Sequence, residues 1–577
     1  MDLLGSRRHH RLHAFRFQRA TLLAIISLVS FVTLWSCWHI ANVPLGSATL
    51  HLTTYPSVIE DGGDLVVFWH GTARRHERDF LAISCGPQRD VWDVLETRNV
   101  TDTDATPNSV RFSGLYMMRC DYKVVYFGYH VGSRTFETLA SVVVGMRDPF
   151  VQPKQGHLAL TTATDAMTIS FNSASNRTPS ARFGLTRDAL TEIATGISST
   201  YSATDMCSAP ATTFSQRLYR NPGYMHNVLI SHLEPDTEYF YQYGSDVDGW
   251  SEVYRFRSAP RVGSTATVKF IAYSDMGVGG APTAQSTVTH VFRDVAANGF
   301  DSFLLHVGGL SCSRGDGSVW DRFMHEIAPI ATRVPYMVSI GNYEYDYQSG
   351  GSHDTSGAGG TNGFHPAWGN FGSDSNGECG VPTVHRFHVP ATGNSLFWYS
   401  FDYASVHVIQ LSSEHAWTQG SEQFQWLERD LAAVNRTATP WIVVTTHRMM
   451  YSTKIDLDDD RRVGMHLREE MEQLLMKHRV NLVLSGHQHS YERSCAVYQG
   501  KCASDGRSAP VHIVVGTAGY DLSNSGYSPR FGAWSVTHLN EYGYLRAVVE
   551  QQSMTVQFVS TRRGIIADQV TLQPFHV

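Results

Sequence analysis

The sequence predicts an α/β domain, with β-sheets flanked by helices, preceded by two β-sandwich modules and an N-terminal transmembrane helix. An apolar run without charged residues near the start of the chain indicates the membrane helix. Short alternating runs separated by turn residues over 48–262 indicate the two sandwiches. From residue 265 onward, apolar strands alternate with stretches of helical period, which is typical of an α/β sheet. A chain of 577 residues has room for all of these parts.

The start of the chain has the pattern of a membrane signal. Residues 1–20 form a basic tail, and the apolar segment 21–43 follows in a stretch that has no charged side chain from residue 20 to residue 50. About 20 apolar residues span a bilayer, and basic flanks stay in the cytosol. We therefore expect a signal-anchor that makes the chain a single-pass membrane protein, with all later domains lumenal or extracellular. The alternative is a cleaved signal peptide and a secreted protein.

The cysteines and glycosylation sequons suit such an oxidising compartment. The candidate disulfide pairs are Cys495 with Cys502, Cys85 with Cys120, and Cys207 with Cys379. Cys312 is then left as a single thiol beyond the apolar segment. The candidate glycosylation sites are the asparagines of three Asn-x-Thr sequences, which also occur by chance: Asn99, Asn176 and Asn435.

Two β-rich modules are expected before the α/β domain. In the first, 48–150, the run 64–69 is predicted to form a strand after an Asp-Gly-Gly turn. In the second, 151–262, the run 166–171 alternates and the Tyr-rich run 239–244 follows a turn, a pattern that resembles fibronectin type III domains. Both modules are more typical of scaffolding than of chemistry. The formal net charge of -7 also gives no indication of nucleic-acid binding.

Polar residues recur in the α/β domain where the expected strands end. The expected strands are 268–273, 303–307, 334–340, 406–411, 441–446 and 480–484. The polar residues that follow four of them are Asp275, Asn342, His447, His487 and His489. Each has a structural alternative as a turn, loop or buried core residue, but sites in α/β sheets lie at the carboxyl ends of strands. Carboxylate, amide and imidazole ligands together suit Fe, Zn or Mn.

Five short blocks in the α/β domain carry a family resemblance. In chain order they are Asp275-Met276-Gly277, Gly308-Gly309-Leu310-Ser311-Cys312, Gly341-Asn342-Tyr343-Glu344, Val444-Thr445-Thr446-His447 and Gly486-His487-Gln488-His489. With these blocks, residues 150–575 resemble purple acid phosphatases of the large two-domain type, in the calcineurin-like metallophosphoesterase superfamily. The resemblance makes 151–262 the family's N-terminal domain. It makes 265–577 the metallophosphoesterase domain with the family's C-terminal segment.

The resemblance implies two adjacent metals that hydrolyse phosphate monoesters at acid pH. In the family pattern, Asp275 and His489 would bind the first metal. Asn342, His447 and His487 would bind the second.

Three family positions are altered in this chain. Gly309 stands where the family has an Asp that bridges both metals, and Cys312 stands where it has a Tyr ligand of the first metal. Tyr343 replaces a His that contacts the substrate. Because two cations about 3.5–4 Å apart repel, a glycine that supplies no charge does not support the family's paired centre. At most one metal is expected, at the position that contains His487, and activity is expected to be lost or altered.

Three hypotheses remain open. The first is a non-catalytic lumenal or surface domain that binds a partner or ligand, which includes an adhesion ectodomain. The second is a phosphoesterase of reduced activity that uses a single metal on Asn342, His447 and His487. The third is a rebuilt metal pair that includes a Cys312 thiolate, with Asp316 or water supplying charge; thiolate favours Zn. The alternative for Cys312 is a small residue that fills the gap left by Tyr. The substrate, partner and oligomeric state stay open.

Overall fold

The structure is a computed structural model that describes most of the chain beyond the N-terminal segment. The described residues are 50–575 except 72–75, 86–92, 103–106, 117, 213–218, 279–282, 346–352, 359–362 and 456–457. The expected basic tail and transmembrane helix, 1–20 and 21–43, lie outside these residues. Among the described residues, no helix has the length and apolar character needed to cross a membrane.

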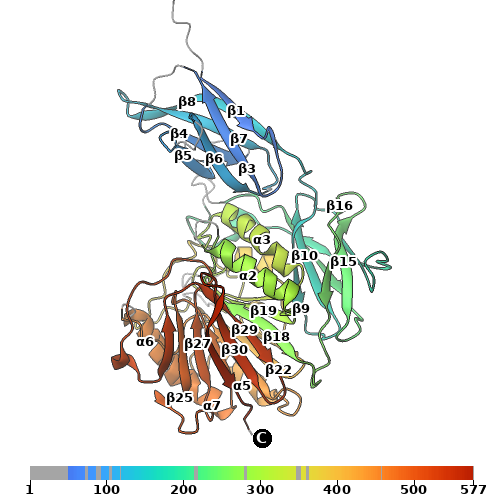
Figure 1. Ribbon diagram of the computed structural model, residues 1–577, viewed down its shortest axis with the longest axis vertical. Helices are drawn as coiled ribbons and strands as arrows, with labels where there is room; N and C mark the ends of the chain where they lie inside the picture. Colours follow the sequence, from blue (N-terminus) through green and yellow to red (C-terminus); the bar gives the residue numbers. More distant parts are fainter. Residues whose placement is uncertain are drawn as a thin grey trace, which may run out of the picture.

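The first module consists of two antiparallel sheets with one parallel edge pairing (Figure 1). One sheet has the order β1 (His51–Tyr55), β3 (Gly63–His70), β6 (Ser109–Leu115). The other has the order β2 (Val58–Ile59), β8 (Thr135–Met146), β7 (Tyr122–His130), β4 (Phe80–Cys85), β5 (Glu96–Asn99). Alternate side chains of β3, among them Leu65, Val67 and Trp69, form the core because successive strand residues face opposite sides of the sheet.

The second module is also built from two sheets. One has the order β13 (Ile197–Ser199), β14 (Tyr224–Ile230), β10 (Met167–Ser173), β9 (Lys154–Leu160). The other contains β12 (Glu192–Thr195), β11 (Ser180–Gly184), β15 (Glu238–Ser245), β16 (Gly249–Trp250) and β17 (Tyr254–Arg257). A 3-10 turn, η1 (Ala203–Asp205), follows β13. The hydrophobic core of the second module is continuous with that of the α/β domain, so the module and the domain pack as one body.

The α/β domain contains two further sheets. The first has the order β20 (Tyr336–Ser339), β19 (Phe303–Val307), β18 (Val268–Tyr273), β29 (Gly543–Val549), β30 (Met554–Ser560), β31 (Ile565–Leu572). The second has the order β21 (Tyr399–Tyr403), β22 (Val406–Leu411), β23 (Trp441–Thr446), β24 (Leu482–Ser485), β27 (Val511–Val515), β25 (Tyr491–Tyr498), β26 (Lys501–Cys502), with β28 (Ser535–Leu539) on β25. β24 begins two residues later than the run 480–484 suggests.

Helices cover the outer faces of this pair of sheets. On the first sheet lie α2 (Ala284–Ala297) and α3 (Gly317–Ala331). On the second lie α5 (Glu422–Ala433), α6 (Asp458–Leu467), the π-helical turn η4 (Arg468–Glu472) and α7 (Gln473–Lys477). Two short helices, α4 (Val381–Arg386) and η5 (Pro529–Phe531), lie in loops. Strand alternation produces the layers: Phe270 faces the second sheet, and Ile271 faces the helices.

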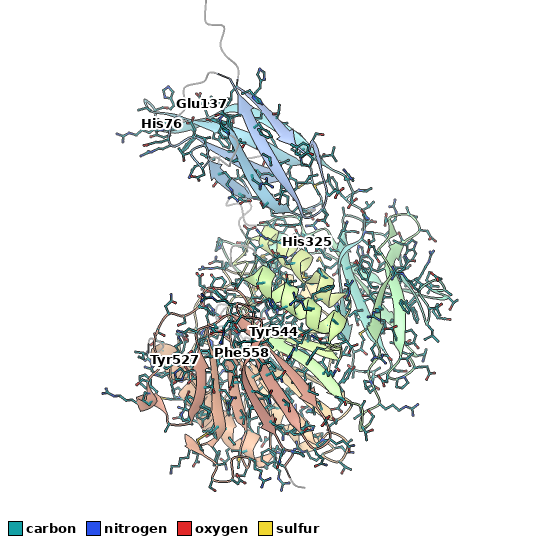
Figure 2. All side chains as sticks on the ribbon, in the orientation of Figure 1. His76, Glu137, His325, Tyr527, Tyr544 and Phe558 are labelled. Atoms are coloured by element: carbon teal, nitrogen blue, oxygen red, sulfur yellow. A yellow bond between two sulfur atoms is a disulfide. The ribbon has the colours of Figure 1, made fainter. Side chains whose placement is uncertain are left out.

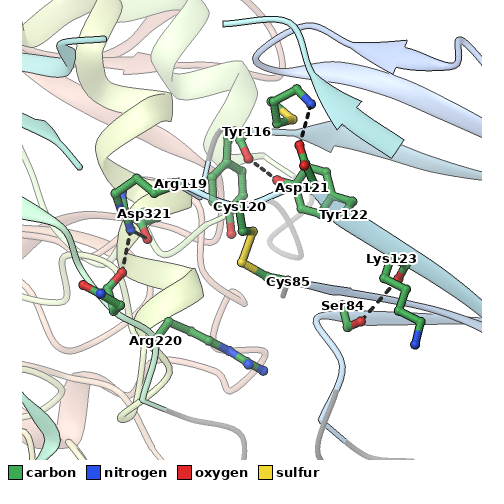
Figure 3. Close-up of a disulfide and its surroundings, with 12 residues drawn as sticks. Ser84, Cys85, Tyr116, Arg119, Cys120, Asp121, Tyr122, Lys123, Arg220 and Asp321 are labelled. Carbon is green, nitrogen blue, oxygen red and sulfur yellow. Dashed lines mark hydrogen bonds and ion pairs between the residues drawn. A yellow bond between two sulfur atoms is a disulfide. The ribbon is translucent and has the colours of Figure 1, made fainter. Parts of the chain in front are cut away.

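The first module is held against α3 by a short segment between β6 and β7. Arg119 forms a buried ion pair with Asp321 of α3 and donates a hydrogen bond to Asn172 Oδ1 at 2.9 Å (Figure 3). The Tyr116 hydroxyl donates to the backbone carbonyl of Ser318 at 2.5 Å. The Cys85–Cys120 disulfide ties this segment to β4. The position of His325 in Figure 2 marks the junction between the module and α3.

Candidate functional site

The structure brings the five expected ligand residues together at the carboxyl ends of β18, β20, β23 and β24. Asn342 Oδ1 lies 3.0 Å from His447 Nε2 and 3.3 Å from His487 Nδ1. Asp275 Oδ1 lies 3.8 Å from His447 Nε2 and 3.8 Å from His489 Nε2. Asp275 and His447 are fully buried. The strand-end rule therefore places these side chains in one cluster.

The contact between His447 and Asn342 has the character of a cation site. His447 Nδ1 lies 2.9 Å from the carbonyl oxygen of Val307, to which it can only donate. Burial lowers the pKa of His447, so the ring is neutral and its Nε2 carries a lone pair. The Asn342 amide donates from Nδ2 to Asp374 at 2.8 Å, which turns Oδ1 toward His447. Two electron-pair donors thus face each other, as ligands of a shared cation do.

His487 is oriented by a carboxylate behind it. Its Nε2 lies 3.1 Å from Asp460 Oδ1, which leaves Nδ1 facing Asn342. Although burial opposes it, the Asp460 carboxylate raises the pKa of His487, so a proton competes with any cation for Nδ1 at acid pH. Asp460 is itself 3.5 Å from Arg448, whose guanidinium donates to Glu414 at 2.9 and 3.0 Å. The network fixes His487 from the far side of the site.

Backbone occupies the place where a bridging carboxylate would stand. Gly309 has φ +61°, and a Cβ added there would lie 2.9 Å from the Asp275 Cα and closer still to its Oδ1. The Glu344 carboxylate holds the loop in this position by accepting from the amides of Gly309, Leu310 and Gly341 at 3.0, 2.8 and 2.9 Å. Asp275 Oδ1 has no hydrogen-bond partner among the described residues. The loop and Asp275 are therefore packed too closely for another side chain.

Comparisons with known proteins agree with this geometry. Residues 153–258, 268–491 and 509–569 match the profiles of the purple acid phosphatase N-terminal domain, of calcineurin-like phosphoesterases, and of the iron/zinc purple acid phosphatase-like protein C. Arabidopsis thaliana "Probable inactive purple acid phosphatase 9" is 34% identical over 94% of this chain and 88% of its own. The chain belongs to the purple acid phosphatase family. Arabidopsis thaliana "Probable inactive purple acid phosphatase 27" is 30% identical over 83% of this chain and 78% of its own.

A solved structure shows the same fold. Purple acid phosphatase PPD1 from yellow lupin (Lupinus luteus) seeds superposes with a TM-score of 0.77 at 24% identity. The match covers 91% of this chain and 96% of the lupin chain. The fold is therefore shared over most of the chain.

The altered family positions offer no charged ligand to the first metal site in this structure. The thiol of Cys312 keeps some contact with solvent, yet burial and the carboxylates of Glu344 and Asp275 raise its pKa well above the ordinary value, so the free thiol is protonated. Asp316 accepts from the amide and hydroxyl of Ser318 at 2.9 and 2.6 Å, as the N-cap of α3. Within the described ranges, no group of three or more His, Cys, Asp or Glu residues could hold a metal ion. The remaining candidate set is mixed: two imidazoles and the Asn342 amide.

Tyr343, at the family's substrate position, belongs to an aromatic rim. Its ring lies 5.9 Å from the ring of Tyr520, which in turn lies 5.2 Å from the ring of His489. The guanidinium of Arg314 lies 5.8 Å from the Tyr343 ring centre. Burial raises the pKa of Tyr343, so it stays a neutral phenol and offers no imidazole-like proton transfer near neutral pH.

Sequence reasoning missed three groups that shape this site. Tyr520 follows the end of β27, and the strand-end rule applied to that strand would have found it. Asp460 lies in the acidic run at the start of α6, where the sequence gives no sign that it faces His487. The role of Asp374 depends on a loop path that no local pattern specifies.

The other predicted residues are placed as follows. Disulfides join Cys85 to Cys120, Cys207 to Cys379 and Cys495 to Cys502, while Cys312 is a free cysteine. The sequon residues Asn99, Asn176 and Asn435 are exposed. Glycosylation itself stays a prediction.

The loop that carries Cys312 makes stability depend on pH. Glu378 accepts from the Gly315 amide at 2.9 Å and the Trp320 indole at 3.1 Å, and burial raises its pKa from 4.5 to about 8. Between these two values the folded protein holds a proton that the unfolded chain releases. The contribution of Glu378 to the free energy of unfolding is therefore fully present below pH 4.5. It falls by about 1.4 kcal/mol per pH unit as pH rises from 4.5 to the folded pKa of about 8.

We expect Glu378→Gln, which stays uncharged, to remove this part of the pH dependence. Denaturant unfolding of both proteins at about pH 5 and pH 8 measures it. The variant is expected to lose less stability than the parent as pH rises. An identical loss in the two proteins would contradict the assignment.

Proposed function

We propose that this chain is a purple acid phosphatase-like protein of the secretory pathway or cell surface that no longer hydrolyses phosphate monoesters with a metal pair. Its site then serves to bind a partner or ligand. The observation that carries the proposal is the close approach of Gly309 to Asp275, which leaves no space for a bridging carboxylate. The names of the two Arabidopsis relatives, both "probable inactive", support it.

One cation position still fits the residues present. Asn342, His447 and His487 would hold the ion, because the facing lone pairs of His447 Nε2 and Asn342 Oδ1 at 3.0 Å need a shared positive charge, and His487 Nδ1 lies 3.3 Å from the same oxygen. Fe, Zn or Mn suits this mixture of imidazole and amide ligands. When bound, a metal there would act as a Lewis acid toward a phosphoryl or carboxyl oxygen. Asp460 would keep His487 oriented, and Asp374 would keep the Asn342 oxygen turned inward.

The location is part of the same proposal. The basic tail and apolar segment of residues 1–43 support a single-pass signal-anchor, with secretion after cleavage as the alternative. Three disulfides support an oxidising compartment for the rest of the chain.

Metal content and phosphatase activity of the full chain test this function together. We expect at most one metal per chain. Between about pH 4 and pH 8, we expect p-nitrophenyl phosphate to be hydrolysed no faster than in buffer alone, under conditions in which an active family member hydrolyses it. His447→Ala is expected to lose the metal, and the matched control His232→Ala, at an exposed histidine, to keep it. Two metals per chain with turnover that disappears in His447→Ala would overturn the proposal.

A further inference from the structure

A pocket of about 350 Å³ lies behind the inherited site, among the segment after β23, α6 and η5. α6 lies on the outer side of the large domain (Figure 1). Three arginines and three methionines line most of the pocket: Arg461, Arg468, Arg530, Met449, Met450 and Met465. A cationic face and an apolar, adaptable face thus meet in one cavity.

The pocket shares a wall with the inherited site. Two of its lining residues are Asp460 and Ser452. Asp460 bonds His487, and the Ser452 hydroxyl bonds the side chain of Gln488. The Asp460 charge is already matched by His487 and Arg448. The only carboxylate among the lining residues therefore does little to neutralise the arginines.

Aromatic rings position two of the arginines. The Arg461 guanidinium lies 3.8 Å from the centre of the Phe531 ring, and that of Arg468 lies 4.7 Å from the centre of the Tyr451 ring. Neither Arg468 nor Arg530 forms an ion pair with any residue that the structure describes. These two guanidiniums keep their fork of N–H donors available for an anion.

The apolar side of the pocket is open at its edge. Met465 is 48% exposed and Phe531 is 39% exposed, which is high for side chains of this size. A second pocket of about 450 Å³ shares Met465, Arg468 and Phe531 with the first, so the two adjoin. It continues along Trp534 and Tyr498, and its two carboxylates are already engaged: Glu469 pairs with His466, and Glu472 accepts from the Tyr451 hydroxyl. Together the two pockets have room for a ligand of ordinary small-molecule size.

We propose that this pocket binds an organic anion that has one sulfate-, sulfonate- or phosphate-like head and an apolar body. The head lies against Arg468 and Arg530, and the body lies against the methionines and Phe531. The site needs no metal and uses none of the five ligand residues. It therefore goes beyond the proposed function and stands or fails separately from it.

Calorimetric titration of the full chain with naphthalene-1-sulfonate tests the proposal, because this probe is neither a phosphate ester nor a strong metal ligand. We expect it to bind at least about tenfold more tightly than inorganic sulfate or 1-naphthol, which carry only the head or only the body. Met465→Glu adds a carboxylate at the open edge, and we expect it to weaken binding by at least about tenfold. Met465→Gln, of equal size but uncharged, is expected to stay within about threefold.

Two further variants locate the binding. Arg530→Gln, at an exposed position outside the core, is expected to lower the affinity for the probe. Arg562→Gln, at an exposed arginine on another loop, is expected to leave the affinity unchanged. His447→Ala is expected to leave binding unchanged. Equal affinity in Met465→Glu and Met465→Gln, equal binding of 1-naphthol, or loss of binding in His447→Ala would each overturn the proposal.

Discussion

Replacing Gly309 with alanine is expected to lower the free energy of unfolding by about 2–5 kcal/mol. The backbone there has φ +61°, which disfavours any side chain, and the new Cβ would press on the Asp275 Cα at 2.9 Å. A backbone atom cannot move aside as the end of a flexible side chain can. Denaturant unfolding measures the loss, and hydrogen exchange at the amides bound by Glu344 locates it.

Gly564→Ala is the matched control for this effect. Gly564 has φ +65°, but nothing lies within 4 Å of a Cβ built there. It should therefore show only the conformational cost, about 1–2 kcal/mol. Equal losses in the two variants would mean that the contact with Asp275 is loose.

The same crowding predicts that Gly309→Asp, Cys312→Tyr and Tyr343→His together do not restore phosphatase activity, since the loop itself has to move first.

Replacing Asp321 with alanine is expected to cost about 3–5 kcal/mol, because it leaves the Arg119 guanidinium buried without its carboxylate. The side chains of Arg119 and Asp321 are 6% and 1% exposed. The first module should then detach from α3, so limited proteolysis between β6 and β7 is expected to accelerate at the same time.

An exposed ion pair provides the comparison. Glu238 and Arg255 lie 2.8 Å apart with both side chains well exposed, so Glu238→Ala is expected to cost less than about 1 kcal/mol. If Asp321→Ala cost no more than Glu238→Ala, Arg119 would have to reach another partner or solvent.

Local patterns were sufficient to predict the layered core but not its full topology. The change from period two to alternating strands and helices near residue 265 marks the start of the α/β domain, and β18, β19 and β23 all lie where apolar runs predict them. Which strands share a sheet could not be predicted, because the antiparallel strands β29, β30 and β31 join β18 from the far end of the chain. Such pairing depends on long-range contacts that no sequence window contains.

The candidate site shows the same limit. The five ligand residues follow parallel strands of both sheets, and the carboxyl ends of these strands meet at the site. The sequence shows that Gly309 replaces the family's bridging Asp. It does not show that the backbone at Gly309 fills the space that this side chain would need. That position of the backbone depends on Glu344, whose buried carboxylate gathers amides from two loops, and on φ values that only the folded backbone reveals. Only the backbone geometry therefore shows whether such a site still has room for the lost ligand.

The spacing of the disulfides has a consequence for biosynthesis. Cys85 and Cys120 are 35 residues apart, so they can pair soon after both leave the ribosome, whereas Cys207 and Cys379 are 172 residues apart. At about 5–20 residues per second, Cys207 waits on the order of 10–30 s for its partner. Cys312 emerges first during that interval, and it stays unpaired in the finished fold. Cys312 is therefore the first thiol made after Cys207, and it is available to Cys207 before the native partner Cys379 has been synthesised.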